Sequence, residues 1–125
     1  MLGPSQMAAI HHISLELCAA DVDASVHFWA LLGFVQTTPP AEIRDRAVWL
    51  RAAHAQIHLL VRERPVVAPE GHVAVVLGDA YESILEALAQ AGHAIDPRRP
   101  HWGSPRAYAS APGGHRVELM CTPPP

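Results

Sequence analysis

Cysteine is scarce in this sequence, and neither sign of charge predominates. Cys18 and Cys121 are the only cysteines among the 125 residues, which suits a reducing compartment better than a disulfide framework. The formal net charge of −3 lacks the basic excess that attracts nucleic acids or anionic membranes, so we expect neither as a partner. The sequence therefore argues against a disulfide scaffold and against a binder of polyanions.

Long apolar stretches are also missing. No run approaches the roughly 20 residues that a membrane-spanning helix needs. The first ten residues, MLGPSQMAAI, lack a basic start and a long apolar segment, so we expect no export and a cytoplasmic location. With 50% hydrophobic and 17% charged residues, the chain has the composition of a globular domain that buries a core.

Histidine is the residue that the sequence has in excess. The nine histidines equal lysine and arginine combined. Most of them must lie on the surface, so a functional subset requires a geometric reason.

An internal repeat supplies such a reason. Residues 11–17 and 71–77 are each typical of a strand, and residues 21–33 and 79–92 of a helix. Three short strand-like segments follow each helix, at 34–38, 47–52 and 55–61, and again at 93–97, 106–111 and 115–120. The pattern predicts an α+β fold of two βαβββ modules, with the following boundaries: an N-terminal tail 1–9, modules 10–63 and 71–121, a linker 64–70 and a C-terminal tail 122–125.

The helix ends carry their own signals. Asp21 and Asp79 are candidate N-caps, and Glu82 would complete a capping box with the second. Gly33 and Gly92 stand where a left-handed C-terminal cap is expected.

The two halves match at an offset of 60 residues. At this offset His12 falls on His72, and His58 falls on Glu118. Strand alternation places these four side chains on the face opposite the helices, and it assigns His11 to the packed side. The four residues are therefore candidates for one shared site.

Three imidazoles and a carboxylate suit a divalent cation, which we take as Zn, Ni, Fe(II), Co or Mn. Four protein ligands leave open positions for water or a chelating substrate in a five- or six-coordinate metal. The alternative is a metal-free polar pocket, in which each group must find hydrogen bonds of its own.

Four segments resemble the vicinal oxygen chelate superfamily, which includes glyoxalase I, methylmalonyl-CoA epimerase, extradiol dioxygenases and bleomycin resistance proteins. They are HHISLEL (11–17), DVDASVHFWALLGF (21–34), GHVAVV (71–76) and YASAPGGHRVELM (108–120). The resemblance runs from about residue 10 to residue 121. It implies a glyoxalase-like fold in which paired modules curl around one metal, and it suggests a homodimer whose modules pair within a chain or between chains.

Carried onto this chain, the resemblance matches His12, His72 and Glu118 to the most constant ligand positions. His58 stands at the fourth position, where glyoxalases and epimerases commonly have Glu or Gln. The first prediction is a lyase or isomerase that acts on a small molecule through a metal-bound enolate, with His58 or Glu118 moving protons.

Two other functions remain open. The extradiol dioxygenases use two histidines and one carboxylate around Fe(II), and Tyr108 also matches one of their active-site residues. The bleomycin-resistance kind binds drugs without a metal.

Weaker candidates lie outside the four. Arg99, Trp102 and Arg106, with Arg98 and His101, belong to RRPHWGSPR (98–106), which is either a substrate-binding lid or a solvated loop. Glu16 shares the alternation of His12 and is a candidate base, substrate contact or solvated residue. Trp29 and Trp49 are interpreted as packing residues, and His115 is assigned no special role.

Overall fold

The structure, a computed structural model, describes residues 7–125, which form two modules with the same order of strands and α-helices. The expected tail 1–9 therefore falls partly outside the described residues. Module 1 comprises β1 His12–Leu17, α1 Val22–Leu31, β2 Val35–Thr37, β3 Ala47–Arg51 and β4 Gln56–Val61. Module 2 comprises β5 His72–Val76, α2 Tyr81–Gln90, β6 Ile95–Arg98, β7 Arg106–Ser110 and β8 Arg116–Met120. The predicted α+β fold is confirmed.

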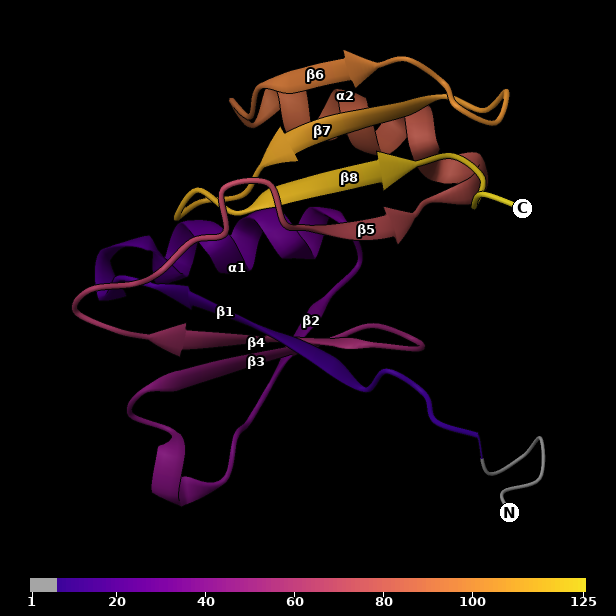
Figure 1. Ribbon diagram of the computed structural model, residues 1–125. Helices are drawn as coiled ribbons and strands as arrows, with labels where there is room; N and C mark the ends of the chain where they lie inside the picture. The colour runs from indigo at the N-terminus through magenta and orange to yellow at the C-terminus, as the bar shows by residue number, and fades with distance from the viewer. Residues whose placement is uncertain (1–6) are drawn as a thin grey trace.

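Each module forms a four-stranded mixed sheet. The strand orders are β1-β4-β3-β2 and β5-β8-β7-β6, with one parallel pair in each, β1 with β4 and β5 with β8 (Figure 1). His12 pairs with Gln56, and His72 pairs with Arg116, so both parallel pairs have the same register. The repeat seen in the sequence therefore extends to the hydrogen bonding.

The helix signals were partly right. Gly33 and Gly92 have φ values of 95° and 91°, the left-handed conformation that a C-terminal cap requires. The capping box of Asp79 and Glu82 was wrong, because Asp79 belongs to a 3₁₀ turn, Gly78–Ala80, and α2 begins after it at Tyr81. Asp21 does occupy the N-cap of α1, but without a side-chain hydrogen bond.

One hydrophobic core joins the two modules. Its large, fully buried side chains include Trp29, Phe28 and Leu17 of module 1 and Leu88 and Leu119 of module 2. The α1 and α2 helices contact each other, and Phe28 meets the His93 ring edge-on. The helix-facing sides of both sheets therefore supply the core, and the opposite faces remain open.

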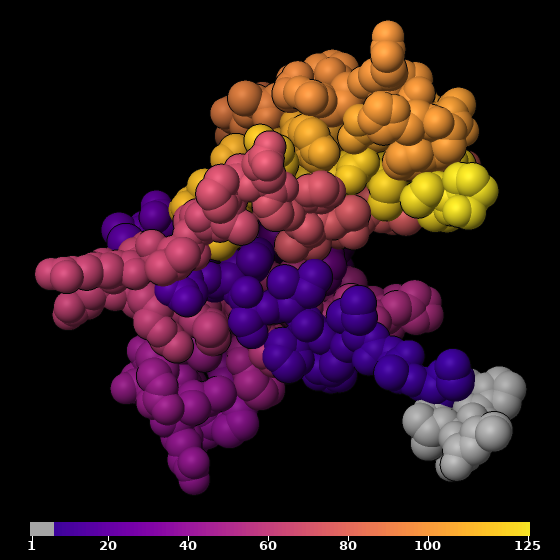
Figure 2. Space-filling model, viewed as in Figure 1, coloured from indigo at the N-terminus to yellow at the C-terminus, as the bar shows by residue number. Residues whose placement is uncertain are grey.

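The linker crosses between the modules on the surface. It follows β4 and returns to the start of β5 (Figure 1). The first half of β1 also lies at the surface between the two modules (Figure 2), which agrees with its exposed residues His12–Ser14. No helix in the described residues is long and apolar enough to cross a membrane.

Candidate functional site

The open face of module 2 brings two of the predicted ligands together. His72 Nε2 lies 3.1 Å from Glu118 Oε1. The Nδ1–H of His72 donates to the Glu70 carbonyl oxygen at 3.2 Å, which points Nε2 at the carboxylate. The other oxygen of that carboxylate, Oε2, accepts a hydrogen bond from Arg106 at 3.1 Å. Each oxygen of Glu118 thus lies beside a side-chain nitrogen.

The strand register explains this grouping. Tyr108 and Glu118 are Cα partners on β7 and β8, and the edge of the Tyr108 ring meets the His72 ring with centroids 5.4 Å apart. Side chains two residues apart on a strand share a face, so residues 106, 108, 116 and 118 all reach the open side. Arg106 and Glu118 are buried, although their face is open.

The open face of module 1 holds the other two predicted ligands in a stack of rings. The His58 imidazole lies between Trp49 and His12, with centroids 4.2 Å and 3.9 Å away. His58 is buried, and its Nε2 lies 2.8 Å from Gln56 Oε1. Burial lowers the pKa of His58 below its ordinary value of 6.5, and the neighbouring His12 and His11 imidazoles lower it further. His58 is therefore neutral near pH 7 and has a basic nitrogen.

The two pairs do not meet within one chain. Among residues 7–125, no three His, Cys, Asp or Glu side chains come close enough to hold a metal ion together. His12 and His58 belong to the sheet of module 1, whereas His72 and Glu118 belong to the separate sheet of module 2. Each sheet therefore presents half of the predicted ligand set.

The polar groups of these half-sites have protein partners without a cation. His58 Nε2–H donates to Gln56 Oε1, and Glu118 Oε2 accepts from Arg106. Because the Nδ1–H of His72 already donates, the contact of its Nε2 with Glu118 Oε1 is a hydrogen bond only when both ring nitrogens of His72 carry protons. In the described part of the chain, the only buried side-chain nitrogen or oxygen atom without a partner is Trp29 Nε1, in the core. Unsatisfied polar atoms therefore do not indicate that these groups need a shared partner. Evidence for a metal site has to come from the chemistry of the donor atoms.

That donor chemistry does fit a divalent metal. An imidazole whose Nδ1–H is held by a backbone carbonyl presents Nε2 in the orientation usual for a metal ligand, and ligating carboxylates are themselves hydrogen-bonded. His72 and Glu118 have both features. The stacked rings of His12 and His58 are nearly parallel, at 16°, so joint binding requires the exposed His12 side chain to rotate.

The weaker candidates have varied positions. Glu16 accepts a hydrogen bond from the Val66 N–H of the linker at 3.1 Å, and Trp102 donates to the Thr122 carbonyl oxygen at 3.0 Å. Arg99 has an exposed side chain, and its carbonyl accepts from Arg106 Nε at 2.9 Å. Arg106 is the first residue of β7 rather than part of a loop. Of these, only Arg106 contacts a predicted ligand.

Sequence reasoning missed three residues. Trp49 is half-buried and stacks on His58, rather than packing in the core. Arg116 lies on the open face of module 2 with its guanidinium 5.0 Å from the centre of the Tyr108 ring. Buried His115 bonds through Nε2 to the Glu16 carbonyl oxygen and so ties the modules together. The repeat did not contain the signal for Trp49, because at the offset of 60 residues it falls on Ala109, whereas in the strand pairing it lies beside His58 as Tyr108 lies beside Glu118.

Comparison of the whole structure with solved structures establishes the fold. A glyoxalase-family protein from Bacillus anthracis is 21% identical with a TM-score of 0.79, covering 91% of this chain and 94% of its own. A lactoylglutathione lyase from Agrobacterium tumefaciens is 18% identical with a TM-score of 0.70, covering 91% and 93%. A glyoxalase/dioxygenase from Nostoc punctiforme is 19% identical with a TM-score of 0.76, covering 99% and 97%.

These similarities define the class to which the structure belongs. The chain has the glyoxalase-like fold, as the resemblance to the vicinal oxygen chelate superfamily implied. No protein-family model and no curated protein matches the sequence. At these identities the likeness concerns the fold, and function has to be argued from the site.

Proposed function

We propose that this protein is a divalent-metal-dependent enzyme that acts on a small molecule with two adjacent oxygen atoms. The observation that supports it most is the His72–Glu118 pair, in which the imidazole nitrogen and the carboxylate oxygen lie 3.1 Å apart on an open face. Their outer atoms are held by the Glu70 carbonyl and by Arg106, as second partners of metal ligands usually are.

We further propose that two chains complete each site. One chain presents His72 and Glu118 on one sheet and His12 and His58 on another. A second copy could place its module 1 opposite module 2 of the first, and twofold symmetry would then create two identical sites. The functional unit would accordingly be a homodimer.

When bound, the metal would polarise both substrate oxygens and stabilise the negative charge that develops on them. Side chains of the protein would orient the ligands and transfer protons. Arg106 orients Glu118 through its hydrogen bond to Oε2. His58, with its lowered pKa, is neutral and, when it exchanges off the metal, can take a proton from a carbon next to the substrate oxygens. Such proton transfer leads to a lyase or isomerase reaction.

Two observations favour other functions. His12, His72 and Glu118 make the two-histidine, one-carboxylate set of Fe(II) oxygenases, and one structural neighbour is described as a glyoxalase/dioxygenase. Against any metal, His58 bonds to Gln56, Glu118 accepts from Arg106, and His12 Nδ1 lies 3.0 Å from His11 Nδ1, which favours a metal-free binding protein.

Metal analysis of the purified protein tests the proposal. We expect about one equivalent of a divalent metal per chain, and loss of most of it in His72→Ala. His27→Ala, which changes an exposed histidine on α1, is the matched control and should retain the metal. Equal metal content in wild type and His72→Ala would overturn the ligand assignment, and metal-free wild type that also fails to take up added metal would favour the binding protein.

A complementation experiment tests the shared site. The double variant His12→Ala/His58→Ala and the single variant His72→Ala should each lack metal. After the two are unfolded together, mixed and refolded, random pairing should restore about a quarter of the wild-type metal, because half of the dimers then contain one intact site. No recovery in correctly refolded dimers would show that the site does not join two chains.

Oxygen consumption separates the two enzyme classes. Protein reconstituted with Fe(II) and given a catechol should consume no oxygen if it is a lyase or isomerase. Stoichiometric oxygen uptake with ring cleavage would establish the dioxygenase instead.

A further inference from the structure

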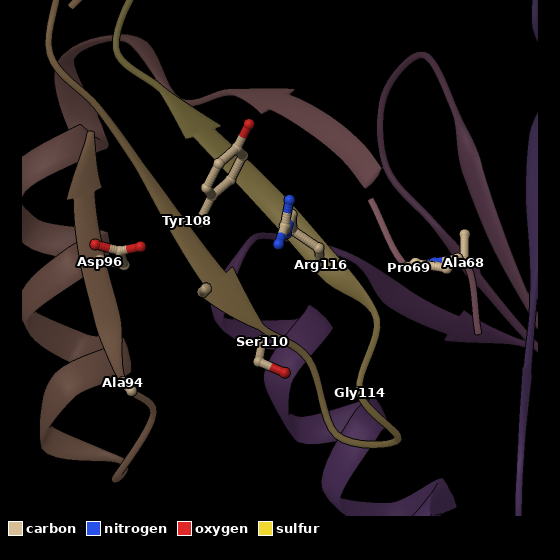
Figure 3. A pocket seen from close by; sticks show the side chains of 9 residues that line it. Ala68, Pro69, Ala94, Asp96, Tyr108, Ser110, Gly114 and Arg116 are labelled. Carbon is tan, nitrogen blue, oxygen red and sulfur yellow. The ribbon is translucent and has the colours of Figure 1, made fainter. Parts of the chain in front are cut away.

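A cavity of about 300 Å³ opens on module 2 beside the half-site (Figure 3). Its polar lining is Tyr108, Arg116, Asp96 and Ser110, and the linker forms one wall (Ala68, Pro69). Figure 3 shows the Arg116 guanidinium near the centre, between Tyr108 and the linker. A second cavity, of about 220 Å³, shares Ala68 and Arg116 and extends to His72. Arg116 therefore stands between the larger cavity and the candidate metal ligands.

Three guanidinium groups surround the Tyr108 ring on this face. The Cζ atoms of Arg98, Arg106 and Arg116 lie 5.2, 5.6 and 5.0 Å from the ring centroid, within the range of cation–π attraction. Two of the three are neutralised. Arg98 pairs with Asp96 at 3.0 Å, and Arg106 pairs with Glu118 at 3.1 Å.

Arg116 is the exception. Within residues 7–125 its guanidinium forms no ion pair and no side-chain hydrogen bond. Contact with the Tyr108 ring positions the Arg116 guanidinium without neutralising its charge. The residue is half-buried. A half-buried guanidinium that lines a cavity has donors available for a planar, bidentate anion.

We infer that Arg116 and the cavity beside it bind the anionic group, a carboxylate or a phosphate, of the small molecule that this protein takes. The Ser110 hydroxyl on the cavity wall offers a further donor. Asp96 also lines the cavity and would repel an anion, but its carboxylate is committed to Arg98.

The subsite is placed to act with the half-site. Arg116 and His72 are Cα partners on β8 and β5, so a molecule held at Arg116 could extend through the second cavity towards His72. The corresponding position of module 1 is Gln56, the partner of His12, which is neutral. The anion preference therefore belongs to one module alone. That the anion is part of the substrate rests on the proposed function, whereas the binding itself does not.

Binding to chelator-treated protein tests the inference without a metal. Malonate and inorganic phosphate are titrated in turn into the labelled protein, with two-dimensional NMR following the amides of Ser110, Gly114 and Arg116. We expect saturable shifts confined to the cavity walls, and Arg116→Gln should weaken binding at least about tenfold, as loss of a charge-assisted contact does. Arg46→Gln removes the same charge from an exposed site in module 1 and is the matched control.

Each result of the anion titration either supports or overturns the inference. Equal affinity in wild type and Arg116→Gln, or equal weakening by Arg46→Gln, would overturn the inference, as would shifts spread over all exposed arginines. Malonamide, which has the shape of malonate without its charge, should not bind. Arg116→Gln should keep its metal, so loss of anion binding with normal metal content supports the subsite, and absence of metal with normal anion binding rejects only the proposed metal site.

Discussion

The Trp49 indole and the His58 imidazole lie parallel, with centroids 4.2 Å apart and 6° between their planes. They are Cα partners on β3 and β4, and the residues at the equivalent positions of β7 and β8 are Tyr108 and Glu118. Each module thus has an aromatic ring beside a candidate ligand. In module 1 that ring stacks on the His58 imidazole, whereas in module 2 it lies among three guanidinium groups, so the two open faces differ in chemistry.

His58 should make stability depend on pH. Because burial, with His12 and His11, lowers its pKa in the folded state below 6.5, the unfolded chain takes up the proton first as pH falls. Its stabilising contribution is therefore present above pH 6.5 and is lost as pH falls through the folded-state pKa. Between about pH 8 and pH 5, the Tm of chelator-treated wild type should fall more steeply than that of His58→Gln. Parallel curves would contradict this.

Arg106 should tune metal binding through Glu118. Removing a partner that orients a ligating carboxylate typically lowers metal affinity about 10- to 100-fold, and we expect that loss for Arg106→Met. Competition with a chromophoric chelator measures the affinity. Arg98→Met is the control, because Arg98 lies on the same face as Arg106 but pairs with Asp96 instead of Glu118. An equal loss of metal affinity in both variants would mean that the positive charge of this face, and not the hydrogen bond to Glu118, determines metal affinity.

His115 should stabilise the docking of the modules. Its Nε2 bonds to the Glu16 carbonyl oxygen across the module boundary, and its side chain is buried. His115→Ala leaves that carbonyl without its partner, at a cost of about 1–3 kcal/mol in the free energy of unfolding. Urea unfolding should show a lower midpoint with an unchanged m value. Exposed His101→Ala should change the free energy by less than about 0.5 kcal/mol.

Trp29 combines good packing with an unsatisfied donor. It is fully buried, and its Nε1–H has no partner in the described structure. Trp29→Ala should therefore cost about 3–5 kcal/mol through the cavity it leaves. Trp29→Phe should cost much less, because it removes the unpaired donor along with part of the ring. Chemical unfolding measures the free energy of unfolding of both variants. Equal losses of that free energy would contradict the prediction.

Local features of the sequence were enough to predict the elements and most of the faces. The prediction for His11 was wrong, because it precedes β1, is exposed and lies beside His12 and His58 instead of on the packed side. Side-chain direction in a strand alternates residue by residue, so the positions of His72 and Glu118 on the open face could be derived from spacing alone. The turns at Gly33 and Gly92 were equally local, since only the backbone conformation at that residue decides them. The capping box failed because a 3₁₀ turn before α2 moved Asp79 out of the cap, and such a turn has no firm sequence signature.

The sequence by itself determined the duplication, the order of the elements and the residue types on each open face, because these follow from periodicity within short segments. Only the tertiary structure decided which side chains meet. His58 stacks on Trp49, Glu118 is held by Arg106, and Arg116 is left without a carboxylate. Those contacts depend on how strands and modules dock, which is a property of the packed core and not of any one segment.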